Sequence, residues 1–177
     1  VVIASSIETG STSTAAITQI TGGGLQFWRR AIYTDPTSNA SQTTELWYAS
    51  NYGYSTLTNV TIQINYNGNV DDQIVFASNY VGVNLDHPWT SSGPSYSNQT
   101  PDSYHAIVTA TIAEAGTLGI AVFAVPTGTQ PGYAINWTGE SQQNNSGNQW
   151  WEDGSFSIQP FTESQNNLIV TSEYTTS

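Results

Sequence analysis

Short apolar runs alternate with polar turn signals about every ten residues along most of this sequence. The clearest run is Thr56–Tyr66, where Val60, Ile62 and Ile64 occupy alternate positions and polar residues lie between them. A period of two is typical of a strand with one buried face, and no stretch shows the longer period of an amphipathic helix. Many short strands with frequent turns predict an all-β fold, an antiparallel two-sheet sandwich of the immunoglobulin-like kind.

The other strands are predicted from the same signals. Leu118–Val125 is apolar on both faces, which predicts a central strand, and Glu114–Thr117 is expected to join it in a hairpin to Tyr104–Ala113. A turn is expected at Asn67–Asp72. The remaining predicted strands are Leu25–Tyr33, Glu45–Ala49, Gln73–Ala77, Val81–Leu85, Gly132–Thr138, Gly154–Ile158 and Asn167–Ser172.

Residues 1–20 differ from everything that follows them. Ten of the twenty are β-branched, which favours extended backbone, and the stretch holds one charge, Glu8, and no aromatic residue. Three consecutive glycines, Gly22–Gly24, follow it and predict a hinge. We therefore expect an extended N-terminal β tail over residues 1–24, joined to a β-sandwich domain over residues 25–177.

An extended β-branched segment can complete the sheet of a neighbouring subunit by donor-strand pairing. Repeated from subunit to subunit, such a contact does not close on itself and builds a filament. The alternative is that residues 1–20 form the first strands of their own sandwich, and the sequence leaves both arrangements open. The side chains that would fill the neighbour's groove are Val1, Val2, Ile3, Ile7, Ile17 and Ile20.

The composition argues against several classes of function. The 177 residues include 13 acidic residues and only two cations, Arg29 and Arg30, so the chain lacks the positive charge that nucleic-acid binding requires. It has no cysteine for disulfides or thiolate metal sites, and no apolar run reaches the length of a membrane span. The absence of methionine favours an exported chain from which a signal peptide has been removed, and trimming is the alternative.

Residues suited to catalysis are few and scattered. His105 falls in an expected strand, and His87 lies beside Asp86 in an expected loop, without a nucleophile or zinc-binding motif near either. The adjacent carboxylates of Asp71–Asp72 and Glu152–Asp153 would point to opposite sides of an extended backbone, so they do not indicate a paired catalytic site. We therefore expect no enzymatic activity, no bound metal and no cofactor.

The six tryptophans fall into two groups. Three lie in expected strands and are predicted to be core residues: Trp28, Trp47 and Trp137. The other three lie in expected loops, where an indole ring can stack on a sugar ring or fold back over the end of the sandwich: Trp89, Trp150 and Trp151. The second group leaves a carbohydrate-binding β-sandwich module as the alternative function.

Five Asn-x-Ser/Thr sequons offer sites for N-linked glycans. Their number is close to what chance gives in a chain so rich in Asn, Ser and Thr, so it is their placement that is informative. Two lie on the polar sides of expected strands, Asn59 and Asn136. Three lie in expected loops, Asn39, Asn98 and Asn144, so all five are expected to be exposed.

The chain resembles the subunits of thread-type extracellular filaments from thermoacidophilic archaea. The resemblance rests on the β-branched Val1–Ile20, the glycines Gly22–Gly24, the five sequons and the lack of Lys and Cys. It implies a secreted, N-glycosylated, β-rich subunit that joins identical subunits through N-terminal donor strands. The expected product is a cell-surface filament that serves adhesion or cell-cell contact. A type IV pilin does not fit, because Val1–Gly24 cannot supply its long apolar N-terminal helix.

Overall fold

All the regular structure in the described part of the chain is β-strand, which confirms the predicted all-β class. No apolar helix of membrane-spanning length occurs in that part. The chain divides into two compact units, unit 1 (Val1–Pro88) and unit 2 (Trp89–Ser177). The computed structural model describes residues 1–9, 14–35, 41–51, 58–89, 93–94, 105–112, 117–126, 131–132, 138–148, 150–160 and 165–174.

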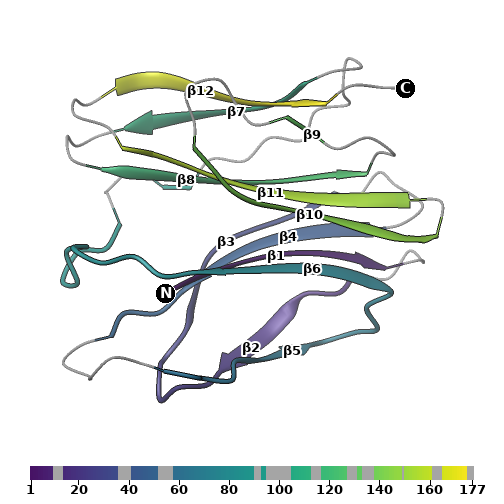
Figure 1. Ribbon diagram of the computed structural model, residues 1–177, viewed down its shortest axis with the longest axis horizontal. Helices are drawn as coiled ribbons and strands as arrows, with labels where there is room; N and C mark the ends of the chain where they lie inside the picture. Colours follow the sequence, from purple (N-terminus) through teal and green to yellow (C-terminus); the bar gives the residue numbers. More distant parts are fainter. Residues whose placement is uncertain are drawn as a thin grey trace. The chain divides into compact units, whose positions relative to one another are not determined.

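Unit 1 contains two antiparallel sheets (Figure 1). The four-stranded sheet has the order β3-β4-β1-β6, and its strands are β1 (Val2–Thr9), β3 (Trp28–Asp35), β4 (Ser41–Tyr48) and β6 (Asp72–Ser78). The two-stranded sheet pairs β2 (Ile17–Thr21) with β5 (Gln63–Tyr66). β1 is therefore an interior strand with a partner on each side.

The ladders on the two sides of β1 are almost complete. Every residue of β1 has a register partner on β4, and all but Thr9 have one on β6. The pairing with β4 continues one residue further, because Val1 and Ala49 exchange two backbone hydrogen bonds, each of 2.9 Å. β-branched residues such as those of β1 suit this position, because their side chains pack well on a pleated surface that is covered by neighbouring strands.

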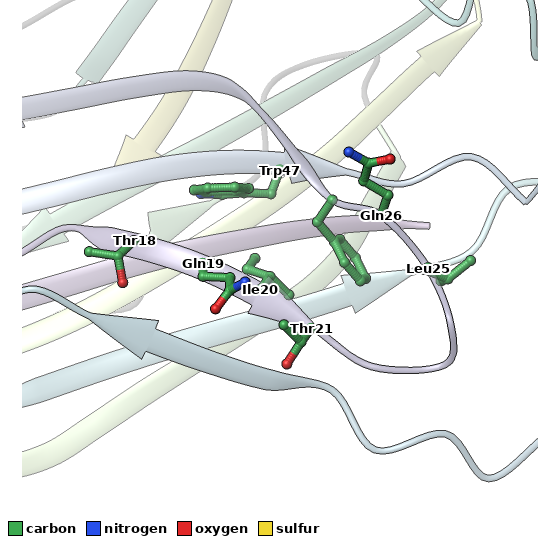
Figure 2. Close-up of a pocket in the computed structure, with 8 residues that line it drawn as sticks. Thr18, Gln19, Ile20, Thr21, Leu25, Gln26 and Trp47 are labelled. Atoms are coloured by element: carbon green, nitrogen blue, oxygen red, sulfur yellow. The ribbon is translucent and has the colours of Figure 1, made fainter.

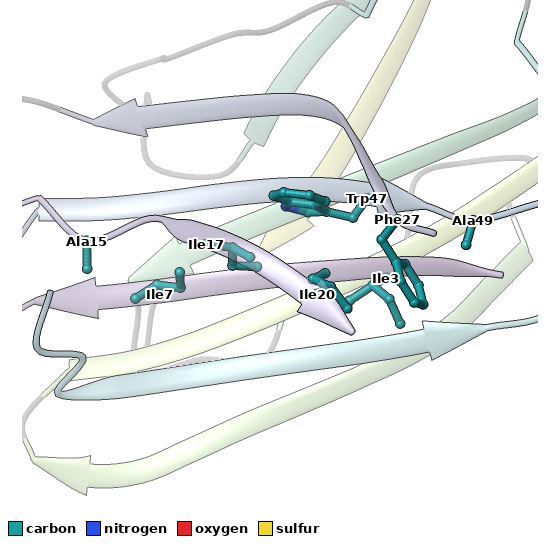
Figure 3. Close-up of a cluster of buried hydrophobic side chains, with 8 residues drawn as sticks. All are labelled: Ile3, Ile7, Ala15, Ile17, Ile20, Phe27, Trp47 and Ala49. Atoms are coloured by element: carbon teal, nitrogen blue, oxygen red, sulfur yellow. The ribbon is translucent and has the colours of Figure 1, made fainter. Parts of the chain in front are cut away.

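The core of unit 1 lies between its two sheets. Ile3 and Ile7 of β1 point toward Ile17 and Ile20 of β2, as Figure 3 shows. The buried cluster also contains Ala15, Phe27, Trp47 and Ala49. Ile62 and Ile64 pack against this cluster, on the side that their alternation in the sequence predicted.

Unit 2 also contains two antiparallel sheets, each of three strands in its described residues. One has the order β10-β11-β8, with β8 (Leu118–Pro126), β10 (Thr138–Asn148) and β11 (Trp150–Pro160). The other has the order β7-β12-β9, with β7 (His105–Ile112), β9 (Pro131–Gly132) and β12 (Gln165–Tyr174).

The predicted hairpin between Tyr104–Ala113 and Leu118–Val125 is wrong. The two strands form as β7 and β8, but β7 pairs with β12 and β8 pairs with β11 in the other sheet. The prediction of a central strand is wrong too, because β8 has one partner among the described strands. Apolar residues on both faces indicate burial of a strand, but they do not determine which strand pairs with it.

Two further strand predictions fail where the backbone turns. Residues 81–85 form bends instead of a strand, and Gly82 adopts a φ of +79° in the left-handed region. Of the strand expected over Thr56–Tyr66, the described residues 58–66 contain only β5 (Gln63–Tyr66). Asn59 has a φ of +55°, a conformation that Asn adopts more readily than most residues and that breaks an extended strand.

Candidate functional site

The two halves of residues 1–20 lie in different sheets of unit 1. β1 belongs to the four-stranded sheet and β2 to the two-stranded sheet, so the segment does not form the single extended tail expected over residues 1–24. Asn67 helps to hold the crossing, because its Oδ1 accepts the Ala16 N–H at 2.8 Å and its own N–H donates to the Ala16 carbonyl at 3.1 Å. In this structure β1 therefore pairs within its own unit, which is the alternative that the sequence left open.

The structure brings most of the predicted interface residues together. Ile3 and Ile7 meet Ile17 and Ile20 in the core, and Val1 packs at its border. Val2 lies on the opposite face of the sheet, where its register partners are Tyr48 and Ser78. The period of two in a strand explains this separation, because neighbouring side chains point to opposite faces.

β1 is the most completely enclosed strand that the structure describes. All eight of its residues are buried, and both of its edges are paired. A strand in this position, between β4 and β6, is held by two kinds of interaction. The backbone ladders supply affinity for any extended segment, and the buried sites of Ile3 and Ile7 select for apolar residues four positions apart.

A buried carboxylate, that of Glu45, lies in unit 1 and was not anticipated from the sequence. Glu45 of β4 is only 1% exposed, and its Oε1 accepts the Ile17 N–H at 2.5 Å. Its Oε2 accepts the Trp47 Nε1–H at 2.8 Å and lies 3.7 Å from Arg29 Nη1. Because Ile17 belongs to β2, the carboxylate ties one sheet to the other. The only sequence signal was that Glu45 alternates with Thr43 and Trp47 on the core-facing side of its strand.

The two tryptophans of the four-stranded sheet have opposite environments. Trp47 is buried, as predicted, and the Arg29 guanidinium lies 5.7 Å from the centroid of its ring. Trp28 was predicted to be a core residue but is 42% exposed. Its ring centroid lies 5.7 Å from that of Tyr48, its register partner, so the two rings form a pair on the face away from the core of unit 1.

A pocket of about 290 Å³ opens beside β2 (Figure 2). Residues 18–21 of β2 line one side, residues 25–27 line the other, and Trp47 completes the lining. The side chains around it are mixed, because Thr18, Gln19 and Gln26 are polar whereas Ile20 and Trp47 are apolar. Polar atoms contribute more of the pocket's surface than apolar atoms do.

The three glycines connect the two sides of this pocket. Gly22, Gly23 and Gly24 all have φ values between +61° and +140°, and the Leu25 N–H donates to the Gly22 carbonyl at 3.0 Å. A Cβ on Gly22 would lie 2.2 Å from the Thr61 carbonyl oxygen. The segment expected to be a hinge is therefore a tight turn packed against neighbouring backbone.

Tyr66 of β5 is a half-buried titratable group that packs against the core cluster of unit 1. Its hydroxyl donates to Gln73 Oε1 at 2.5 Å. Burial of the ring, together with the negative charge of Glu45, raises the pKa of the Tyr66 phenol above its ordinary value.

The predicted glycosylation sites are only partly described. Asn59 is exposed, as predicted, although it lies in a bend rather than a strand. Asn144 was expected in a loop but lies in β10, in register with Asp153 of β11. Asn39, Asn98 and Asn136 lie outside the described residues, as does the predicted core residue Trp137.

The predicted sugar-stacking tryptophans are separated along unit 2. Trp150 and Trp151 begin β11, so their placement in a loop was wrong. The polar residues before them form β10, because a strand can consist of Gln, Asn and Ser where a long partner strand supplies its ladder. Trp89 is half-buried and lies outside any strand, as expected.

His87 lies in a loop, as expected, and its side chain is exposed.

Comparison with known proteins found no matching family model, no similar curated protein and no similar solved structure. The geometry of β1 and of the strands beside it is therefore the feature of this chain that bears on its function.

Proposed function

We propose that this chain is a structural subunit of a secreted, N-glycosylated filament on the cell surface that serves adhesion or cell-cell contact. Identical subunits join head to tail by donor-strand complementation, in which β1 of one subunit occupies the position between β4 and β6 of the next. The acceptor is a two-sheet sandwich of the immunoglobulin-like kind. In the filament, β1 is carried to its neighbour at the start of the N-terminal segment predicted as a tail over residues 1–24, while β2 keeps its pairing with β5.

The observation that carries this proposal is the place of β1 in its sheet. β1 is followed by a crossing into the other sheet, yet it is buried along its whole length and paired on both sides. Without β1, the edges of β4 and β6 and the sites of Ile3 and Ile7 would be open to water. A β1 strand from another copy restores the same ladders and the same burial, so exchange conserves every contact that β1 makes.

The energetics restrict when such an exchange takes place. Burial of Ile3, Ile7 and Val2 contributes about 1.5–3 kcal/mol for each side chain. The two ladders add about 0.5–1.5 kcal/mol for each hydrogen bond. Their sum is comparable to the whole stability of a small domain, about 5–15 kcal/mol. Release of β1 from a folded unit therefore costs a free energy close to that of unfolding the unit, so exchange is expected while the subunits fold.

The composition suits an extracellular polymer. Ser and Thr together make up 45 residues of the chain, so its surface is hydrated by neutral hydroxyl and amide groups as well as by carboxylates. The exposed Asn59 is accessible to a glycan.

A disulfide test distinguishes β1 paired in its own unit from β1 paired in a neighbour. Ser6 of β1 and Thr44 of β4 are register partners, and the chain contains no native cysteine. The variants Ser6→Cys and Thr44→Cys, each in a separate preparation with a distinct mass, are unfolded, mixed and refolded under oxidising conditions. Donor-strand pairing predicts a disulfide-linked heterodimer of the two masses, because opposed strand residues are close enough to be bridged.

Two controls complete this test. The same variants refolded separately and then mixed should yield little heterodimer, because folded units do not release β1. A single chain that carries both cysteines should yield a ladder of covalent multimers. If that chain yields only monomers with an internal disulfide, and the mixed refolding yields no heterodimer, donor-strand assembly is wrong.

The ring pair of Trp28 and Tyr48 favours a second candidate, a carbohydrate-binding module. An exposed indole beside a second ring is a platform on which a sugar ring can stack. Trp89, Trp150 and Trp151 remain the sugar-stacking residues proposed from the sequence. Retardation of the purified chain in polysaccharide gels, abolished in Trp28→Ala and retained in Thr58→Ala, would support this candidate over the filament.

A further inference from the structure

β1 carries one small polar side chain between two isoleucines on its core-facing side. Ile3, Ser5 and Ile7 occupy alternate positions, so they point to the same side of the sheet, and all three are buried. Ser5 is the register partner of Glu45 on β4. The buried carboxylate of Glu45 therefore lies opposite the smallest of these three side chains.

The alternation of β1 does not by itself determine its register. A slip of one residue is opposed, because it would turn the other face of β1, which includes Glu8, toward the core. A slip of two residues keeps the same face inward, so the alternation does not oppose it. In the two registers reached by such a slip, Ile3 or Ile7 would lie opposite Glu45. The residue that faces the carboxylate therefore differs between the observed register and these two.

The carboxylate of Glu45 is held in place by its own partners. Its two oxygens accept the Ile17 N–H and the Trp47 Nε1–H, so it cannot move away from β1 without leaving a buried donor unpaired. Directly opposed residues have Cβ atoms about 4.5–5.5 Å apart. A branched apolar side chain in place of Ser5 would therefore press against a fixed, buried charge, which is unfavourable.

We propose that Glu45 selects the register of the strand between β4 and β6 by accepting only a small residue opposite itself. A buried polar side chain fixes the register of paired helices in coiled coils, and Glu45 acts in the same way on paired strands. The inference concerns the pairing that the structure shows, so it does not require that β1 is exchanged between subunits. It goes beyond the proposed function by naming the residue that aligns the strand.

The sequence contains a single segment with this spacing. Ile3 and Ile7 are the only two isoleucines of the 177 residues that lie four positions apart, and the residue midway between them is a serine. Ile17 and Ile20 of β2 are three positions apart, so they cannot occupy the same two sites from one face of a strand. The spacing therefore distinguishes β1 from the other half of the β-branched stretch.

The first test compares two neighbouring serines of β1. Ser5→Val places a branched side chain opposite Glu45, whereas Ser6→Val makes the same change on the other face, where the register partners are Thr44 and Ile74. The two serines are 1% and 3% exposed, so they are matched in burial. The unfolding equilibrium constant from urea titration should rise at least tenfold more in Ser5→Val, a difference of about 1.4 kcal/mol. Equal effects of the two changes would overturn the proposal.

The second test moves the small residue and asks whether the register follows it. The exchanged strand carries Ile3→Ser together with Ser5→Ile, so its small side chain lies two positions nearer the start of β1. A slip of two residues then returns a serine to the position opposite Glu45, with Val1 and the new isoleucine on either side. Without the slip, an isoleucine would face the carboxylate.

Engineered disulfides report which register forms. Ser6 lies opposite Thr44 in the observed register and would lie opposite Gln42 after the slip. On oxidative refolding, Ser6→Cys should link to Thr44→Cys in the unchanged strand and to Gln42→Cys in the exchanged strand. An exchanged strand that still links positions 6 and 44 would show that Glu45 does not select the register.

Both tests give an answer that is independent of donor-strand exchange. The linked pair reports the register whether the disulfide joins residues of one chain or of two chains. If the exchanged strand prevents folding, the comparison of Ser5→Val with Ser6→Val decides the proposal alone.

Discussion

β1 and β2 come from the same β-branched stretch of sequence but have different roles in unit 1. β1 is an interior strand with two partners, and all of its residues are buried. β2 has one partner in the described strands, and two of its five residues are exposed. Their isoleucines nevertheless meet in the same core. The comparison shows that composition makes both segments strands, whereas the number of partner strands decides which one holds the fold together.

The largest difference between the two strands is expected when a proline is placed in each of them. Ser6→Pro removes a backbone donor in the middle of β1 and disrupts ladders on two sides, so unit 1 should fail to fold. Thr18→Pro falls at the irregularity between the Ile17 and Gln19 pairings of β2, where proline is tolerated. It should cost about 1 kcal/mol, chiefly for the lost bond from the Thr18 hydroxyl to the Asn65 carbonyl. Urea unfolding followed by tryptophan fluorescence measures both, and equal effects would contradict the distinction between the strands.

A smaller effect is expected from the group that ties β2 to the four-stranded sheet. In Glu45→Gln, the amide NH₂ must face either the Ile17 N–H or the Trp47 Nε1–H, and both of these are donors. The unfolding free energy should fall by about 1–3 kcal/mol for the buried donor left without an acceptor. Arg29→Ala is the comparison variant, because its guanidinium is partly exposed and lies 3.7 Å from a carboxylate that keeps both of its hydrogen bonds, so the loss should be smaller, about 1 kcal/mol. A loss in Arg29→Ala as large as that in Glu45→Gln would show that charge pairing, rather than the tie to β2, accounts for the effect.

The smallest expected effect concerns Tyr66, whose register partner is Ile17 of β2. The pKa of Tyr66 is raised in the folded protein, so the folded state holds the phenolic proton more tightly than the unfolded state does. The resulting stabilisation is fully present below the unfolded pKa of about 10 and is lost as the pH rises through the folded pKa. Tyr66→Phe should therefore make the alkaline decline of the unfolding free energy less steep. Urea titrations between about pH 8 and 11 test this, and identical slopes for the two proteins would contradict it.

Much of the fold was accessible from local patterns, but the pairing of strands was not. The alternation of Ile62 and Ile64 predicted their core-facing positions, and the β-branched residues of Val1–Ile20 predicted strands. The predicted β7–β8 hairpin was wrong because closeness in sequence does not by itself stabilise a strand pair. β8 instead forms a nine-residue register with β11, and the hydrogen bonds of that ladder decide the pairing. Trp28 was assigned to the core because a strand pattern alone does not show which face of an edge strand is covered.

The candidate site was predictable in its residues but not in its arrangement. The apolar residues of the N-terminal stretch could be identified as a unit, and four of them do converge. The role of Glu45 could not be foreseen, because a lone acidic residue in a strand is usually solvated. Its burial depends on two hydrogen-bond donors, the Ile17 N–H and the Trp47 Nε1–H, and on the Arg29 guanidinium 3.7 Å away.

The amino-acid sequence by itself determined that this chain forms strands and which side chains prefer to be buried, because the period of two and β-branching act within a few residues. Only the tertiary structure decided that β1 lies between β4 and β6, that β2 crosses to the second sheet and that the three glycines form a packed turn. Those outcomes depend on hydrogen bonds and buried contacts between residues that are far apart in the chain. The free energy of each long-range contact depends on the other strands, because a contact is buried and fully hydrogen-bonded only when all the strands are in place.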